Sequence, residues 1–286
     1  MSRRNNESRM GGTHMPEHAD PPPQVTEKTF DPLHFVAPTE FVELPSKGQG
    51  YPQGHPLCGQ EAVEIRFMTA KEEDILTSRT LLKKGVAIER VLQSLIKDKN
   101  IDVGSMLVGD RNAMLVAARS SAYGEWYKTT ITCPSCGAQN KKAFKLTEPD
   151  VYHGDNFEEY DIQKTDRGTF NVTLPYSKLI VECRLLTGKD EMTLVKKIQD
   201  KKNKEKDGLV LSQMHLYIVS VNEYTEPQVV DYTINNMVAP DSRYLRNAVN
   251  AFTPRLKISG DFECNSCGHE QELEVPFGAD FFWPDR

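Results

Sequence analysis

The sequence has no apolar run close to the roughly 18 residues that a membrane-spanning helix needs, and its beginning lacks the apolar core of a signal peptide. It has only six cysteines in 286 residues. Together these features favour synthesis in a reducing cytoplasm and argue against insertion into a membrane.

Familiar catalytic motifs are also missing. The sequence has no G-x-S-x-G, no phosphate-binding P-loop and no H-E-x-x-H. His153 and His215 are isolated, and His55 and Cys58 share a loop without a third group that would activate the cysteine as a nucleophile. Cys183 lies in an expected strand and is interpreted as a buried thiol. We therefore predict no catalytic residue, no small-molecule substrate and no enzymatic activity.

A concentrated positive charge is absent too. The formal net charge is −6, with 35 basic and 41 acidic residues interspersed along the chain. Proteins that bind nucleic acid need a basic surface for phosphate contacts, so this balance disfavours that class. The length fits two modest domains or one large one with a real core.

What the sequence does contain is two C-x-x-C-G motifs, Cys133–Gly137 and Cys264–Gly268, each flanked by strand-like sequence. They supply four thiolates, the number in a closed tetrahedral zinc site, and each glycine allows a tight turn that points backbone amides at the sulfurs. A compact zinc ribbon separates its cysteine pairs by about 15–20 residues, whereas these pairs lie much farther apart. One shared metal would therefore join distant parts of the chain. The predicted metal ligands are Cys133, Cys136, Cys264 and Cys267.

Three other interpretations of the motifs stay open. The first is a disulfide within each pair, although redox-active C-x-x-C motifs usually accompany a thioredoxin-like βαβ pattern that is absent here. The second is a rubredoxin-like iron site, which would use the same four residues. The third is a site in which each motif meets its counterpart in a neighbouring subunit. Structural zinc is the prediction because both pairs are present, and iron is not excluded.

The second half of the chain repeats landmarks of the first half in the same order. The matching segments are Val42–Pro45 with Val172–Pro175, Arg66–Glu73 with Arg184–Glu191, and Asp110 with Asp241, which precede Cys133 and Cys264 by the same number of residues. Both halves also carry a helix capping box, Thr69–Glu72 and Thr187–Asp190. These ordered matches indicate an internal duplication.

The predicted fold is α+β, with two repeated halves that each combine a β-hairpin, helices and a C-x-x-C knuckle hairpin, joined by one zinc-ribbon-like Cys₄ site. We place a flexible N-terminal arm at residues 1–38, the first repeat at 39–150, a linker at 151–169, the second repeat at 170–278 and an aromatic tail at 279–286. The arm either stays unstructured or orders on a neighbouring subunit. The tail either folds back or forms a contact for a partner.

Local signals give further expectations. Asp110 is a favourable N-cap for a helix over residues 111–123. The apolar segment Leu211–Val221 is interpreted as either helix or strand. Ser46–Gly59 is a Gly/Pro-rich loop that follows a strand and is available for contacts with neighbouring subunits.

Eight segments are distinctive in combination. They are Phe41–Tyr51, Met68–Ser78, Leu81–Gly85 and Cys133–Gly137 in the first half, and Leu186–Glu191, Asp241–Leu245, Cys264–His269 and Phe281–Pro284 in the second. Through these segments the chain resembles the baseplate hub protein family of T-even-like contractile-tailed phages. The resemblance covers about residues 40–286 and leaves the arm uncovered.

The resemblance implies a structural virion component or an assembly factor of the central hub of the tail baseplate. Such a protein is made and assembled in the host cytoplasm and works through contacts with other baseplate, hub and tail proteins. The resemblance supplies no active site. It also leaves open whether the protein stays in the mature virion or acts only during assembly.

A zinc-ribbon regulator that binds nucleic acid is the alternative function. Lys141, Lys142 and Lys145 form the only basic group beside a knuckle, and the acidic residues around the second knuckle argue against this class. A lytic or redox enzyme is a third and weaker hypothesis.

Overall fold

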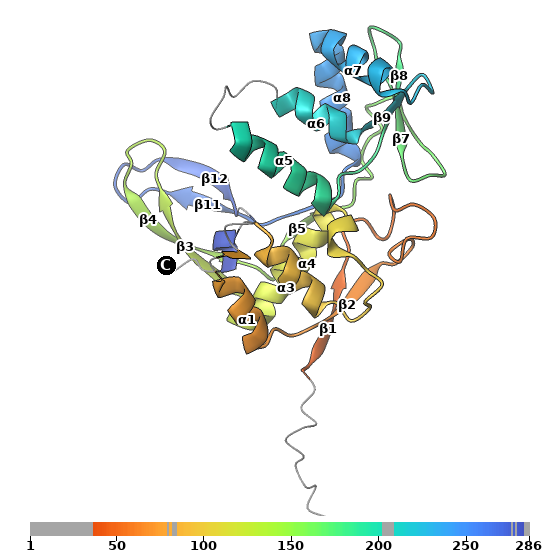
Figure 1. The fold of residues 1–286 in the computed structure, drawn as a ribbon. Coiled ribbons are helices and arrows are strands. Elements are labelled where there is room, and N and C mark those ends of the chain that lie inside the picture. Colours follow the sequence, from red (N-terminus) through yellow and green to blue (C-terminus); the bar gives the residue numbers. More distant parts are fainter. Residues whose placement is uncertain are drawn as a thin grey trace, which may run out of the picture. The chain divides into compact units, whose positions relative to one another are not determined.

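Helices and small antiparallel sheets alternate along the chain (Figure 1). This computed structural model describes residues 37–78, 80–81, 85–201, 209–275, 277 and 279–282. Residues 1–36 of the predicted arm and 283–286 of the predicted tail lie outside the described residues. The predicted combination of α and β elements is confirmed. No helix in the described part of the chain is both long and apolar enough to cross a membrane.

The first half begins with a β-hairpin and continues into helices. Antiparallel strands β1 (Thr39–Glu43) and β2 (Ala62–Arg66) flank the predicted Ser46–Gly59 loop. The elements that follow are α1 (Ala70–Thr77), α3 (Ala87–Leu95), the 3₁₀ helix η2 (Val103–Ser105) and α4 (Val108–Tyr123). Directly after α3, Ile96 pairs with Ile65 of β2, so this helix ends against the hairpin.

The second half contains a four-stranded antiparallel sheet in the order β6-β7-β8-β9, followed and interrupted by helices. The bounds are β6 (Ile162–Lys164), β7 (Phe170–Thr173), β8 (Ile180–Cys183), α5 (Gly188–Lys201), α6 (Leu209–Tyr217), β9 (Ile218–Val221), α7 (Pro227–Asn236) and α8 (Ala239–Phe252). The apolar segment Leu211–Val221 is therefore both helix and strand, because it runs through the end of α6 and then forms β9 beside β8.

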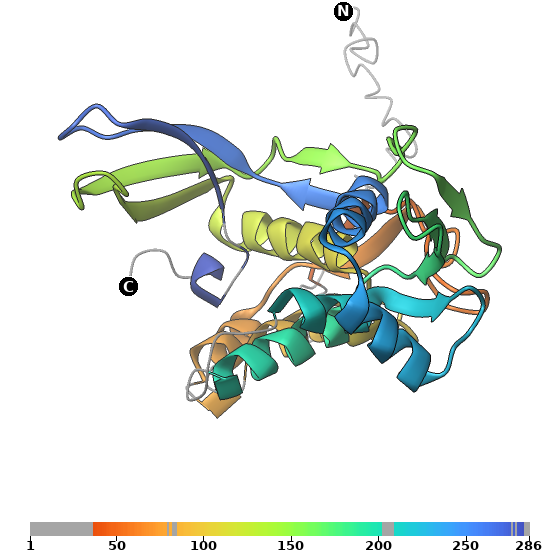
Figure 2. The same cartoon turned by 90° about the horizontal axis from the view of Figure 1, so that it is seen from above.

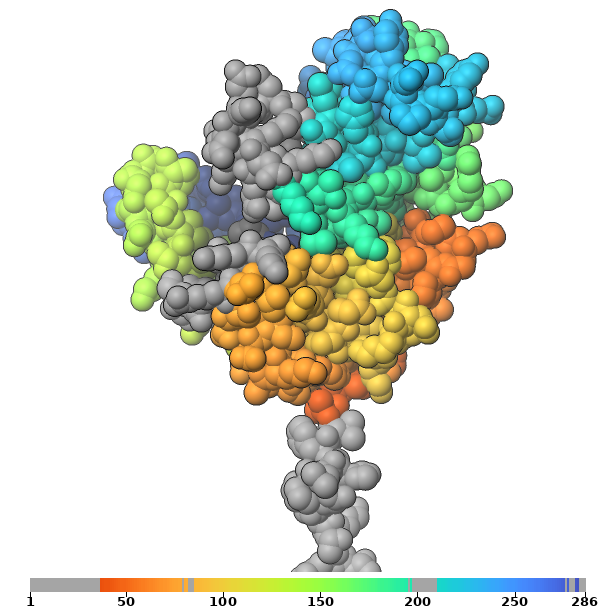
Figure 3. Space-filling model, in the orientation of Figure 1, coloured from red at the N-terminus to blue at the C-terminus, as the bar shows by residue number. Residues whose placement is uncertain are grey.

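Two further hairpins carry the cysteine motifs in their turns, and we call them the knuckle hairpins. The first pairs β3 (Trp126–Thr132) with β4 (Gln139–Lys145), and the second pairs β11 (Ser259–Glu263) with β12 (Glu270–Glu274). Strands β5 (Asp150–Tyr152) and β10 (Arg255–Lys257) pair with each other at the bases of the two hairpins. Figure 2 shows the hairpins side by side, and in Figure 3 they project together beside the helices.

One apolar core runs through both halves. Its fully buried side chains include Leu92 and Met114 from the first half and Phe252 from the second. Helix α4 packs against elements of both halves, namely β1, α3, α5 and β10. Burial of apolar surface therefore holds the halves together independently of the knuckle hairpins.

Two aromatic side chains of the predicted tail are buried. Phe281 and Phe282 lie in the 3₁₀ helix η3 (Ala279–Phe282) and are 1% and 2% exposed. The Phe281 ring lies 5.1 Å from that of Tyr127 in β3, and Arg119 Nε donates a 2.7 Å hydrogen bond to the Phe281 carbonyl oxygen. These two aromatics fold back onto β3 and α4, so they do not form an exposed contact for a partner.

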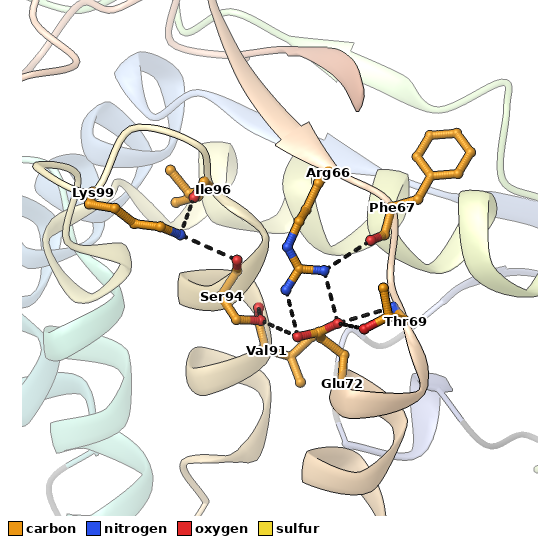
Figure 4. A network of polar contacts seen from close by, with 8 residues as sticks. All are labelled: Arg66, Phe67, Thr69, Glu72, Val91, Ser94, Ile96 and Lys99. Atoms are coloured by element: carbon orange, nitrogen blue, oxygen red, sulfur yellow. Dashed lines mark hydrogen bonds and ion pairs between the residues drawn. The ribbon is translucent and has the colours of Figure 1, made fainter. Parts of the chain in front are cut away.

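A buried carboxylate links β2 to the start of α1 (Figure 4). Glu72 accepts hydrogen bonds from the guanidinium of Arg66 at 2.7 and 3.0 Å, and from the amide and hydroxyl of Thr69 at 3.0 and 2.7 Å. Ser94 of α3 donates to the same carboxylate at 3.0 Å. The predicted capping box is thus also the anchor for a strand and a second helix.

The second half has the same arrangement with a shorter acid. Asp190 accepts two 2.7 Å hydrogen bonds from Arg184 and further bonds from the amide and hydroxyl of Thr187. Each arginine also donates to the carbonyl of the residue that follows it, Phe67 or Leu185. The junction between strand and helix is therefore built in the same way in both halves.

The expected N-cap role of Asp110 is wrong. Helix α4 begins at Val108 with Leu107 as its N-cap, so Asp110 lies inside the first turn. Its buried carboxylate accepts hydrogen bonds from the backbone N–H and hydroxyl of Ser46 and from the hydroxyl of Tyr51, at 2.6–2.9 Å. Asp110 therefore holds the β1–β2 loop, which supplies the donors for its carboxylate.

Asp241 behaves in the same way in the second half. It lies in the first turn of α8, which has Val238 as its N-cap, and it accepts from the backbone N–H groups of Tyr176 and Ser177 at 3.0 and 2.9 Å. These residues lie in the turn between β7 and β8. In both halves, an acid in the first turn of the helix before the knuckle hairpin holds a loop of the β-hairpin.

Candidate metal centre

Each cysteine motif forms the same tight turn. In the first, the Cys133 N–H donates to Ala138 O at 2.8 Å, and the Gly137 N–H donates to Cys133 O at 2.9 Å. In the second, the corresponding bonds run from the N–H groups of Cys264 and Gly268, both at 2.9 Å. Gly137 and Gly268 have φ values of 74° and 65°, a conformation that glycine adopts without steric cost. The predicted tight turn at each of these glycines is confirmed.

The two hairpins face each other through a small apolar cluster. Phe262 of β11 is 2% exposed and lies with Cys133 and Cys264, and Ile131 and Leu273 pack against this group. Farther from the turns, Gly260 lies so close to Phe144 that an added Cβ would come within 3.3 Å of its ring. These contacts pack the two hairpins against each other, so that their cysteine turns lie side by side.

The four predicted ligands come together. Their sulfur atoms all lie within 4.8 Å of one another. The distances across the two hairpins are 3.8 Å between Cys133 Sγ and Cys267 Sγ, and 3.6 Å between Cys136 Sγ and Cys264 Sγ. A tetrahedral ion with metal–sulfur bonds of about 2.3 Å has sulfurs about 3.8 Å apart, whereas a disulfide bond measures about 2.05 Å. The four thiols can therefore hold a metal ion, and none is in a disulfide.

The site is closed on one side and reaches the surface on the other. Cys133 and Cys264 are buried, whereas Cys136 and Cys267 are exposed. All four positions are occupied by cysteine, so a tetrahedral ion bound here has no open position for a substrate. This arrangement suits a structural role.

The thiols differ in their affinity for protons. The backbone N–H of Ser266 and then that of Cys267 lower the pKa of Cys264 to about 6, against the effect of desolvation. At Cys136 the Ala138 N–H also lowers the pKa, but the neighbouring thiols and desolvation outweigh it and raise the pKa to about 12. A divalent cation favours the thiolate at both positions, so binding would release protons.

Asn140 of β4 also contacts the cluster, although the sequence did not predict it. It is 5% exposed, and its Nδ2 lies 3.5 Å from Cys264 Sγ and 3.1 Å from Ala138 O. Its Oδ1 accepts from the Asn265 N–H at 2.9 Å. One side chain of the first hairpin therefore contacts a sulfur and the backbone of the second turn. Asn140 lies between Gln139 and Lys141 and belongs to no recognisable motif, so the sequence offered no signal for it.

Neither His269, which lies in the second cysteine turn, nor the candidates His55 and Cys183 belong to the cluster. His269 Nε2 lies 3.1 Å from Gln271 Oε1 in its own hairpin. His55 stacks on Tyr51 and contacts Ser105 Oγ at 2.9 Å. Cys183 is fully buried, and desolvation raises the pKa of its thiol, which makes it a poor nucleophile.

The model of the family described as T4 bacteriophage base plate protein matches residues 37–283. The chain belongs to this family. The expected resemblance is thus confirmed at the level of a T4-like phage base plate protein. Comparisons with curated proteins and with solved structures gave no match.

Membership in the base plate family implies a structural or assembly role, contacts with other base plate and tail proteins, and a place in the tail of the virion. The four-cysteine cluster of this base plate protein agrees with that role, because it can hold a metal but leaves no open coordination position.

Proposed function

We propose that this chain is a non-enzymatic component of the central hub of a contractile-tail baseplate, acting in its structure or assembly through contacts with other hub and tail proteins. Zinc bound by Cys133, Cys136, Cys264 and Cys267 fixes the two knuckle hairpins to each other. The host cytoplasm is the place of synthesis and assembly. The observation that carries the proposal is the meeting of two cysteine pairs from distant parts of a base plate family chain.

Zinc is the metal that best suits this centre. Four thiolates in tetrahedral array are typical of structural zinc, which has no redox chemistry and tolerates a fully protein-made shell. Iron can occupy the same ligand set, so the experiment has to identify the element.

The two halves arose, in this proposal, by duplication of one unit, with the first repeat at 39–150 and the second at 170–278. Three pairs of matching contacts support it. Arg66 and Glu72 correspond to Arg184 and Asp190, both with a capping threonine. The loop contacts of Asp110 and Asp241, and the two cysteine turns, correspond as well. Duplication would explain why each half supplies half of the site.

The first test is metal content per chain, measured by elemental mass spectrometry on the wild-type protein and on Cys133→Ser and Cys264→Ser. We expect one zinc per chain and its loss from both variants. Cys58→Ser is the matched control, since Cys58 is an exposed cysteine outside the cluster, and it should keep the metal. Zinc that survives either cluster mutation, or a metal-free wild-type protein, would contradict the shared site.

The hub role needs a separate test. Tails assembled in infected cells without a working copy of this protein are expected to lack a normal central hub in electron micrographs. The wild-type chain should restore the hub, whereas Cys264→Ser should restore it poorly. Normal hubs in the absence of the protein would contradict the role.

A further inference from the structure

The two cysteine turns are alike in their backbone, but they differ in one buried contact. Asn140 is the second residue of β4 and lies opposite Ile131, on the face of the hairpin that meets the other hairpin. The residue in the same place in the second hairpin is Gln271, the second residue of β12, opposite Phe262. The chain therefore provides an internal comparison.

Asn140 bridges the two hairpins and Gln271 does not. The amide of Asn140 uses both of its donor directions and its acceptor, toward Ala138 O, Cys264 Sγ and the Asn265 N–H. Gln271 contacts His269 within its own hairpin, and the described residues show no hydrogen bond from it to the first turn. Among the described residues, an amide side chain of the opposite hairpin thus holds the second turn but not the first.

The orientation of the Asn140 amide follows from its neighbours. The Asn265 N–H is a donor and needs the oxygen, whereas Ala138 O and a thiolate at Cys264 are acceptors and need the nitrogen. Turning the amide over would place its oxygen against two acceptors and its nitrogen against a donor. The side chain is therefore fixed by three contacts from a buried position.

These contacts serve a metal ligand in two ways. The bond to the Asn265 N–H fixes the backbone directly after Cys264, so the ligand is in place before a metal arrives. The N–H donated to Cys264 Sγ stabilises negative charge on that sulfur when it binds the metal. Outer-shell groups of this kind orient metal ligands and affect affinity.

We propose that Asn140 is a positioning residue of the metal centre, which docks the second cysteine turn against the first and donates a hydrogen bond to Cys264 Sγ. The proposal rests on the proposed shared metal site. In this proposal the two hairpins have different roles. Asn140 of the first hairpin holds the turn of the second, whereas Gln271 of the second hairpin does not contribute to metal binding.

The test is a titration of the metal-free, full-length protein with Co²⁺, followed by the sulfur-to-cobalt charge-transfer absorbance, with a competing chelator to measure the dissociation constant. Asn140→Leu keeps the number and branching of the side-chain heavy atoms but has no hydrogen-bonding group, and should weaken Co²⁺ binding by about 10- to 100-fold. Gln271→Leu is the matched control and should bind Co²⁺ as the wild type does.

The absorbance distinguishes positioning from general stability. Loss of the N–H donor makes the Cys264 sulfur richer in electrons, so the charge-transfer band of Asn140→Leu should move to lower energy. Asn140→Thr guards against a failure of Asn140→Leu to fold, because threonine is favoured in strands but its hydroxyl reaches one bond less far. It should show the same loss of affinity and the same shift.

Wild-type affinity and an unshifted band in Asn140→Leu or Asn140→Thr would overturn the proposal, as would an equal loss in Gln271→Leu. If the proposed shared metal site itself were wrong, the Co²⁺ titration would give a different result. In that case the wild-type chain would bind no Co²⁺, or Cys133→Ser and Cys264→Ser would bind it normally.

Discussion

Glu72 and Asp190 occupy the same place in the two strand-to-helix junctions, but their side chains differ in solvent exposure. The Glu72 side chain is fully buried, while that of Asp190 is 13% exposed. Burial alone would raise the pKa of Glu72, but hydrogen bonds from Arg66, Thr69 and Ser94 outweigh it and hold the pKa at about 2. The ion pair at Glu72 is therefore favourable in the folded protein despite its desolvation.

Glu72→Gln should lower the free energy of unfolding by about 2 kcal/mol, because the buried Arg66 contact loses its charged acceptor. Asp190→Asn is the matched control in the other half. It should cost less, since both Arg184 and Asp190 are more exposed to water. Urea unfolding of the two variants measures both values. A loss at Asp190 as large as that at Glu72 would show that burial does not set the difference.

The Glu72 carboxylate also predicts that the stability of the protein depends on pH. Its pKa in the folded protein is about 2, below the ordinary value of 4.5, so the ionised form stabilises the fold above about pH 4.5. This contribution is lost as the pH falls from about 4.5 toward 2. The melting temperature of the wild type should drop in that window, and Glu72→Gln should show a flatter curve. Parallel curves for the two proteins would contradict the assignment.

At the scale of elements, the sequence predicts the parts that local chemistry determines. The two knuckle hairpins follow from C-x-x-C-G turns between strand-like segments, and the capping boxes follow from Thr69 and Thr187. The segment Leu211–Val221 stayed ambiguous because a short apolar run suits both helix and strand. The structure resolves it as the end of α6 followed by β9.

Contacts between distant segments could not be predicted. Asp110 has the composition of an N-cap, but its partners Ser46 and Tyr51 lie in a loop far away in the sequence. Asn140 is similar, since its importance depends on Asn265 and Cys264 of the other hairpin. The sequence predicts the four cysteine ligands, but only the fold shows that the Asn140 side chain contacts one of them, Cys264.

The second knuckle hairpin places acids directly opposite one another. Asp261 pairs with Glu272, and Glu263 pairs with Glu270, all of them exposed. Like charges opposite each other on neighbouring strands are destabilising. The alternation of the strands puts these acids on the face away from Phe262. The hairpin therefore depends on its inner face and on its turn for stability.

Glu272→Lys should stabilise this hairpin by about 0.5 kcal/mol, since it replaces a repulsive pair with an attractive one. Hydrogen exchange of the β11 and β12 amides measures the gain, which should shrink as salt is added. Glu274→Lys is the control, because it removes the 3.2 Å ion pair with Lys257 and should give no gain. Equal protection in the two variants would mean that cross-strand charge has no influence here.

For the whole molecule, the main core and the metal centre are separate sources of stability. The core cluster includes Leu92, Met114 and Phe252 and extends through both halves. Among the described residues, the cluster at the cysteine turns has Phe262, Cys133 and Cys264 as its buried members. Without a metal, so small a cluster is at the low end of local stability.

Removing the metal should therefore unfold the knuckle turns and leave the rest of the chain folded. With a chelator present, the amides near Cys133 and Cys264 should lose protection from hydrogen exchange, while those of α4 and β8 keep theirs. Helix α4 packs against both halves, so its amides report on the shared core. Cys58→Ser should respond to the chelator as the wild type does, whereas Cys264→Ser should show the exposed turns without it. Simultaneous loss of protection in α4 would mean instead that the metal, and not the apolar core, holds the two halves of the molecule together.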